Sequence, residues 1–112
     1  MRLRVLGLAL AASALLCGPV RANNVIAVTV GTSSAQALAT PTIAYRMLAI
    51  DNESTTATIA CAFGGTAALN TAGSYTISSS LTRVWMAPGW SMNQAINCIS
   101  DTASTPVTIE FQ

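Results

Sequence analysis

The amino-acid sequence predicts an all-β fold: a small antiparallel β-sandwich of about seven short strands, immunoglobulin-like or jelly-roll-like, preceded by a signal peptide. Three observations lead to this prediction. Short segments alternate between apolar and polar residues, turn-forming residues separate them at short intervals, and helix-like stretches are scarce. The best helical candidates, residues 36–38 and 91–96, are too short to support a helix on their own.

Residues 1–22 have the composition of a secretory signal peptide. Arg2 and Arg4 give a positive start, an apolar run follows, and Pro19 precedes a small-residue cleavage site at Ala22. The apolar run is shorter than the roughly 18 residues that a membrane-spanning helix needs. We therefore expect cleavage after Ala22, with no membrane span left in the product.

Residues 23–112 are then expected to form a single domain that is secreted or periplasmic in a bacterium. A lipid-anchored alternative rests on Cys17, which follows the apolar run. Leu16 disfavours it, because a small residue is wanted before a lipidated cysteine.

The first half of the expected domain contains strand signals separated by turns. Residues 26–30 alternate cleanly and end at a Gly-Thr-Ser-Ser turn. Residues 36–40 are ambiguous, and Pro41 makes them an edge strand or a connection. Residues 42–52 are apolar on both faces, which predicts a strand covered on both sides. The Asp-Asn-Glu-Ser sequence at 51–54 predicts a turn, since short polar side chains bond their own backbone there.

The second half continues the same pattern. Residues 64–68 are expected to form a flexible connection, and Pro88-Gly89 fits the centre of a type II turn that joins a hairpin. The remaining strand signals cover residues 55–63, 75–77, 81–86, 95–100 and 105–112, with a further turn at 70–73.

Two cysteines remain after signal cleavage, and both lie on the apolar side of alternating segments. Cys61 shares a face with Ala57 and Ile59, and Cys98 shares a face with Ile96. An even count in an exported chain favours a disulfide, here one that locks two layers of extended backbone together. Closing a loop of about 38 residues would stabilise the fold by roughly 4 kcal/mol in the chain-entropy model. Two buried free thiols, or a metal site, are the alternatives; a structural zinc site normally needs four ligands.

Charge is scarce, and this excludes several function classes. The chain has no histidine and no lysine, and residues 23–112 have a formal balance of −2. Nucleic acid is therefore not expected as a partner, because phosphate binding needs several basic side chains. Low net charge favours self-association or docking to another protein. The charged residues of the expected domain are Arg46, Arg83, Asp51, Glu53, Asp101 and Glu110.

The same composition argues against an enzyme. Without histidine or lysine, the usual nucleophile–base arrangements cannot be built. A catalytic carboxylate pair survives only if Asp51, Glu53 and Asp101 share one cleft. Calcium binding by the 51–54 segment is less favoured than a plain turn. No cofactor and no metal are expected. Asn52-Glu53-Ser54 also matches a glycosylation acceptor.

The segment around Pro88-Gly89 is the one stretch with binding character. Trp85, Trp90 and, less directly, Tyr75 are the candidate binding residues, because large aromatic side chains anchor protein partners or stack on sugar rings. The alternative is that the tryptophans pack against the sandwich and cap its core.

Residues 46–77 resemble a small β-domain that recurs in bacteriophage and prophage structural proteins. The resemblance rests on Arg-Met-Leu-Ala-Ile-Asp-Asn-Glu-Ser, then on Ala-Thr-Ile-Ala-Cys-Ala-Phe-Gly-Gly-Thr-Ala-Ala, and finally on Ala-Gly-Ser-Tyr-Thr-Ile. It implies a surface module that docks to other subunits, and it carries no site residues. The export signal departs from the phage pattern, since virion subunits assemble in the cytoplasm; an exported relative would combine both features. We therefore expect a non-enzymatic structural or interaction module, with a carbohydrate- or ligand-binding module as the alternative.

Overall fold

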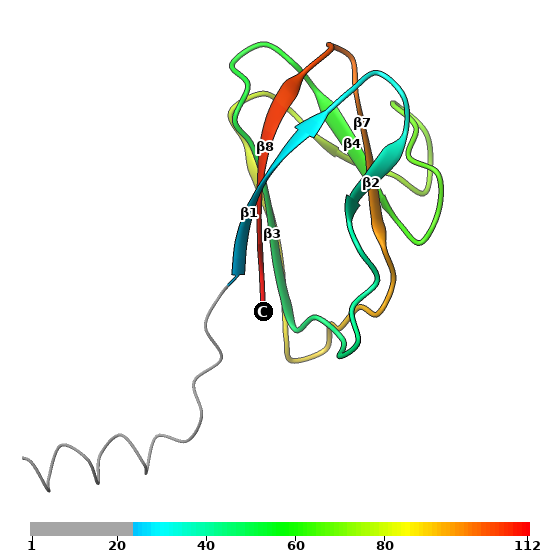
Figure 1. The fold of residues 1–112 in the computed structure, drawn as a ribbon, viewed down its shortest axis with the longest axis vertical. Helices are drawn as coiled ribbons and strands as arrows, with labels where there is room; N and C mark the ends of the chain where they lie inside the picture. The colour runs from blue at the N-terminus through cyan, green and yellow to red at the C-terminus, as the bar shows by residue number, and fades with distance from the viewer. Residues whose placement is uncertain (1–23) are drawn as a thin grey trace, which may run out of the picture.

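The computed structural model describes residues 24–112, so the expected signal peptide, its cleavage site and Cys17 lie outside the described residues. All regular secondary structure in this part of the chain is β (Figure 1). The strands are β1 Asn24–Val30, β2 Ala35–Leu38, β3 Met47–Asn52, β4 Ile59–Phe63, β5 Tyr75–Ile77, β6 Thr82–Met86, β7 Ile96–Ser100 and β8 Thr105–Phe111.

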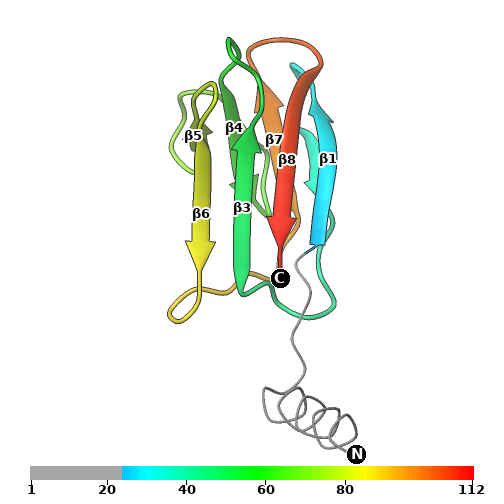
Figure 2. The same ribbon diagram turned by 90° about the vertical axis from the view of Figure 1, so that its left-hand side faces the viewer.

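The strands form two four-stranded sheets that pack face to face. The first sheet has the order β1-β8-β3-β6, and the second has the order β2-β7-β4-β5. Figure 2 shows the first sheet in front, with β6, β3, β8 and β1 side by side, and the second sheet behind it. All named strand pairs are antiparallel. Consecutive strands lie in different sheets except for β4 and β5, which pair with each other. These two strand orders are those of a jelly roll, which decides between the two expected sandwich types.

The core lies between the sheets because every long strand alternates toward it. In β3, Leu48 and Ile50 are fully buried while their neighbours Met47 and Ala49 are only partly covered. In β8, Val107 and Ile109 point inward in the same way. This period of two is what a half-buried strand requires. The buried apolar core comprises Val30, Leu38, Tyr45, Leu48, Ile50, Ile59, Cys61, Ile77, Met92, Ile96, Cys98, Val107 and Ile109.

Two predicted strands begin later than expected, one of them the strand over residues 55–63, which starts only at Ile59 as β4. The expected strand over residues 42–52 begins only at Met47, and its outer face is not covered as a second core face: Ile43 is 65% exposed. Before Met47 the backbone makes one isolated bridge, from Tyr45 to Met92. The ambiguous segment at 36–40 does form a strand, β2, at the edge of the second sheet. It is the strand beyond the expected seven.

The connection after β6 does not close a hairpin. Gly89 adopts a φ of 88°, as its place in the expected turn requires. However, β6 belongs to the first sheet and β7 to the second, so residues 87–95 cross from one layer to the other. The hairpin prediction is wrong because alternation shows which side of a strand faces the core and not which strand lies beside it.

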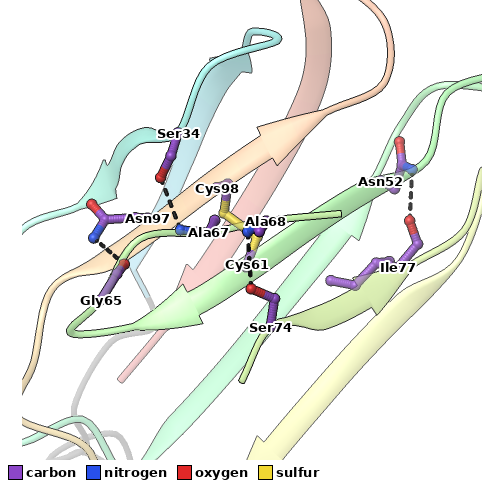
Figure 3. Close-up of a disulfide and its surroundings, with 10 residues drawn as sticks. All are labelled: Ser34, Asn52, Cys61, Gly65, Ala67, Ala68, Ser74, Ile77, Asn97 and Cys98. Atoms are coloured by element: carbon purple, nitrogen blue, oxygen red, sulfur yellow. Dashed lines mark hydrogen bonds between the residues drawn. A yellow bond between two sulfur atoms is a disulfide. The ribbon is translucent and has the colours of Figure 1, made fainter. Parts of the chain in front are cut away.

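The expected flexible connection after β4 is instead docked against the outside of the second sheet. Ser34 Oγ accepts a hydrogen bond from the Ala67 amide at 2.9 Å, and Asn97 Nδ2 donates to the Gly65 carbonyl at 2.6 Å (Figure 3). Gly64 has a φ of 74°, and a Cβ atom there would lie 2.7 Å from the Gln94 side chain. Residues 64–74 therefore cover β4 from outside, and both faces of that strand are buried.

Candidate functional site

The disulfide joins adjacent strands of one sheet. Cys61 on β4 and Cys98 on β7 lie directly opposite each other, with their Cα atoms 4.1 Å apart and their sulfur atoms bonded (Figure 3). Both residues are buried, at 0% and 1% exposure. The predicted pairing is confirmed. The expectation that it joins the two layers is wrong, because both strands lie in the second sheet.

Asn52 is a buried polar residue that ties three segments together. Its Nδ2 donates to the carbonyl of Ala57 at 2.8 Å and to that of Ile77 at 3.1 Å, and Figure 3 shows the second of these bonds. Its Oδ1 accepts from the Ser54 amide at 3.1 Å, which is the local side-chain-to-backbone bond expected of the turn. With 2% exposure and its amide nitrogen engaged, Asn52 is not available as a glycosylation acceptor in the folded protein.

The aromatic side chains gather between the β5 and β6 edges of the two sheets. Trp85 on β6 is paired with the buried Leu48, and Tyr75 on β5 is paired with Cys61. Directly paired residues share a face of a sheet, so both rings point into the space between the layers. Phe63 lies on the same face of β4 as Cys61 and joins them.

We call Phe63, Tyr75, Trp85 and Trp90 the aromatic cluster. Trp85 is at its centre, with ring centroids 5.2 Å from Phe63, 5.3 Å from Tyr75 and 6.4 Å from Trp90. The two indoles are stacked at an interplanar angle of 27°. The cluster closes one open side of the sandwich, as the packing interpretation of the tryptophans expects.

Arg83 completes this side of the molecule. Its guanidinium carbon lies 5.1 Å from the centroid of the Tyr75 ring and 5.9 Å from that of Trp85, within cation–π range. Its Nη1 also donates to the Thr76 carbonyl at 3.4 Å. Arg83 thus reaches from β6 of the first sheet to β5 of the second, and its charge is used in joining the two layers.

Trp90 belongs to the aromatic cluster and also borders a hollow. It lines a hollow of about 420 Å³ at the end of the sandwich, together with Arg46, Ile43 and Pro88. A second hollow of about 390 Å³ has Ile43 and Ala44 in common with the first and is also lined by Tyr45 and Phe111. Among the predicted binding residues, Trp85 is enclosed by rings, Tyr75 is 37% exposed beneath Arg83, and Trp90 borders a hollow. Their role in binding stays a prediction.

The carboxylates do not converge on these hollows. Asp51 lies on β3, and its pKa is raised by partial burial and then by the nearby charges of Glu53 and Glu110. Asp101 makes local hydrogen bonds in a different part of the fold: its Oδ1 accepts from the Thr58 amide at 3.0 Å and from the Thr102 hydroxyl at 3.0 Å. Among residues 24–112, no group of three or more His, Cys, Asp or Glu side chains is placed to hold a metal ion.

The first sheet leaves its outer face open. The exposed side chains on this face include Val25 at 61%, Val84 at 51% and Met86 at 63%. The strand register aligns Val25, Glu110, Ala49 and Val84 in one row across the sheet. The charged side chains that the strands of this sheet direct toward this face are Asp51 and Glu110.

No helix that could span a membrane is found among residues 24–112.

The local turn at residues 51–54 is predicted from the sequence, but the long-range contacts of Asn52 and Arg83 are not. Asn52 continues the inward positions of Leu48 and Ile50 at the same two-residue spacing, and this spacing was the signal that could have placed it in the core. The contacts of Arg83 with Tyr75 and Thr76 have no such signal, because these residues lie on a strand of the other sheet.

Fold and site together define a jelly-roll sandwich with an intrasheet disulfide and one side closed by aromatic rings. No protein-family model matches the chain, and no curated protein matches its sequence. A solved structure of Bacillus endospore appendages, described as a novel family of disulfide-linked pili, matches with a TM-score of 0.45 and 15% identity over 83% of this chain and 87% of that one. Similarity this low implies nothing about function, and the resemblance to bacteriophage modules finds no support in these comparisons.

Proposed function

We propose that this chain is an exported, non-enzymatic structural module that works by associating with copies of itself. The observation that carries the proposal is the placement of its exposed apolar side chains. Of the large apolar residues that the described chain exposes, all but Tyr75 lie on the first sheet or in the segments that lead into it: Val25, Ile43, Leu81, Val84 and Met86. Exposed apolar side chains on one sheet rather than over both favour a contact between that sheet and another protein.

Low charge supports the same proposal. The described residues include two arginines and four carboxylates, and Arg83 is engaged in cation–π contacts. Little electrostatic repulsion therefore opposes the approach of a second copy. Jelly rolls occur in capsid shells as well as in lectins, so the fold itself does not choose between assembly and ligand binding.

Export is part of the proposal. A buried disulfide is typical of proteins that fold in an oxidising compartment, secreted or periplasmic. The full chain expressed in a bacterium should yield a processed product that begins at Asn23. Mass spectrometry of the purified protein would measure this, and a chain that keeps residues 1–22 in the cytoplasm would contradict it.

Sedimentation velocity over a wide concentration range tests the association. The exported protein should shift from a monomer toward a larger species as its concentration rises. A strict monomer across the whole range would contradict self-association.

A carbohydrate- or ligand-binding module is the second candidate, and the hollow beside Trp90 favours it. Trp90 and Arg46 line the same hollow, so a sugar bound there could stack on the indole while its polar groups bind the cation. Glycan-array binding that disappears in a folded Trp90→Ala variant would support this function. No binding, with both indoles shielded from quenchers, would count against it.

A further inference from the structure

The four sheet edges of the sandwich are not alike. Edge strands present unpaired backbone N–H and C=O groups, and natural proteins blunt them with short strands, charges, proline or bulges. Three edges here carry such features. β5 has only three residues, and Arg83 binds the carbonyl of Thr76 on it. β6 carries a charged residue, Arg83. β2 has only four residues, its register shifts between Gln36 and Leu38, and Pro41 follows it closely.

The edge of β1 carries none of these features. The strand has seven residues, Asn-Val-Ile-Ala-Val-Thr-Val, with no charge and no proline. All seven pair with β8 without a register shift. Within residues 24–112, the backbone groups of β1 that point away from β8 make no hydrogen bond. The natural occupant of such an edge is another extended backbone.

We propose that β1 pairs antiparallel with β1 of a second copy, around a two-fold axis at Ala27. This inference rests on the proposed self-association and names the surface that mediates it. Ala27 is the middle residue of the strand, so pairing around it uses the full length of both strands. The two first sheets then join into one continuous sheet across the dimer, with β1 beside β1 at its centre.

The side chains of β1 fit a second copy. Pairing around Ala27 sets Ile26 opposite Val28 of the other copy on the inner face. Both residues are only partly buried in the single chain and pack against its core, so the contact would extend the apolar core across the interface. On the outer face, Val25 meets Thr29. Such apolar and β-branched cross-strand pairs stabilise antiparallel sheets, and no like charges face each other.

The two-fold axis provides a direct test, because residue 27 faces itself. Ala27 is exposed, so a longer side chain there can point to solvent without entering the core. In Ala27→Lys, two ammonium groups would lie side by side in the dimer, and in Ala27→Glu two carboxylates would do so. Each variant alone should be monomeric, while an equimolar mixture should form a one-to-one heterodimer.

Thr82→Lys is the matched control, since Thr82 is also exposed on the outer face, opposite Asp51, but lies on β6 at the opposite edge and is not one of the exposed apolar residues. Exported proteins would be compared by sedimentation velocity and native mass spectrometry, with circular dichroism to check folding. Support consists of a dimer for the parent chain and for Thr82→Lys, together with monomers and a mixed heterodimer for the Ala27 variants.

The other outcomes overturn one proposal or both. If the parent chain and the Ala27 variants associate alike, self-association stands and the β1 interface is wrong. If the parent chain forms open-ended species, the two-fold pairing is wrong, because that symmetry closes at two copies. If the parent chain is strictly monomeric, the proposed function fails and the interface fails with it.

Discussion

At the scale of single residues, the Asn52 side chain makes three hydrogen bonds that connect β3, the following turn and β5. It is one of a few buried polar residues, and each of its amide hydrogens reaches a different carbonyl, one after β3 and one in β5. Every buried side-chain nitrogen and oxygen of the described residues has a partner. Removing the side chain would leave the carbonyls of Ala57 and Ile77 without their donor.

We expect Asn52→Ala to lower the free energy of unfolding by about 2 to 4 kcal/mol, because two buried carbonyls lose their hydrogen bonds. Urea denaturation would measure the loss. Asn97→Ala is the control, since Asn97 also donates to a carbonyl but at an exposed position, and its cost should stay below about 1 kcal/mol. Equal losses for the two variants would contradict the role of Asn52.

Asn52→Asp separates hydrogen bonding from side-chain volume. A carboxylate there would face two carbonyl oxygens in a buried site, so burial and repulsion would raise its pKa in the folded state. A raised folded pKa means that stability falls as pH rises through that value. The variant should therefore be less stable near neutral pH than in mild acid, as thermal melts at both conditions would show.

At the scale of strands, β6 depends on the aromatic cluster for its attachment to the second sheet. The Trp85 ring contacts three other rings and the Arg83 guanidinium, whereas the Trp90 ring contacts two rings, those of Phe63 and Trp85. Trp85→Ala should therefore cost about 3 kcal/mol or more, and Trp90→Ala about half of that. Urea denaturation measures both losses. Trp85→Phe, which keeps a ring in place, should recover part of the stability; a larger loss for Trp90 would contradict this geometry.

Asp51 gives the outer face of β3 a pH dependence. Burial, Glu53 and Glu110 raise the pKa of its carboxyl above the usual value of 3.8. The folded state then binds the proton more tightly than the unfolded state does, so this group lowers stability as pH rises through its raised pKa. Asp51→Asn should raise the melting temperature at about pH 7 and leave it nearly unchanged at about pH 3.

Asp101→Asn serves as the comparison for Asp51→Asn, because it removes the same charge from a different part of the chain. A rise in melting temperature that is the same for both variants would point to net charge as the cause. A rise specific to Asp51→Asn would point to the carboxylates around β3.

At the scale of the whole molecule, the disulfide holds the middle of the second sheet. It joins residues 37 positions apart, and the chain-entropy model assigns such a loop about 4 kcal/mol. That is a large part of the 5 to 15 kcal/mol that typically separates folded from unfolded domains. The free energy of unfolding measured in urea should be lower by about this amount for the double variant Cys61→Ala, Cys98→Ala. It should fall by a similar amount for the parent chain when the disulfide is reduced.

Much of the architecture follows from alternation along the chain. The sequence predicts the inward positions of Ile26, Val28 and Val30, of Cys61 and of Cys98, because a strand with one buried face must repeat every two residues. β2 was ambiguous because four residues are too few to establish a period. The predicted strand over residues 42–52 starts earlier than β3, because Ile43 is exposed and Tyr45 enters the core from a segment that makes only one isolated bridge.

The sequence by itself determined the all-β class, the core side of the long strands and the pairing of the two cysteines, because these depend on local periodicity and on cysteine count. Only the tertiary structure decided the jelly-roll order, the placement of the disulfide within one sheet, the crossing of residues 87–95 between layers and the difference between the edges of β1 and β6. The physical reason is that a strand's neighbours are chosen by contacts between distant segments, and no local pattern records which segment those contacts will select.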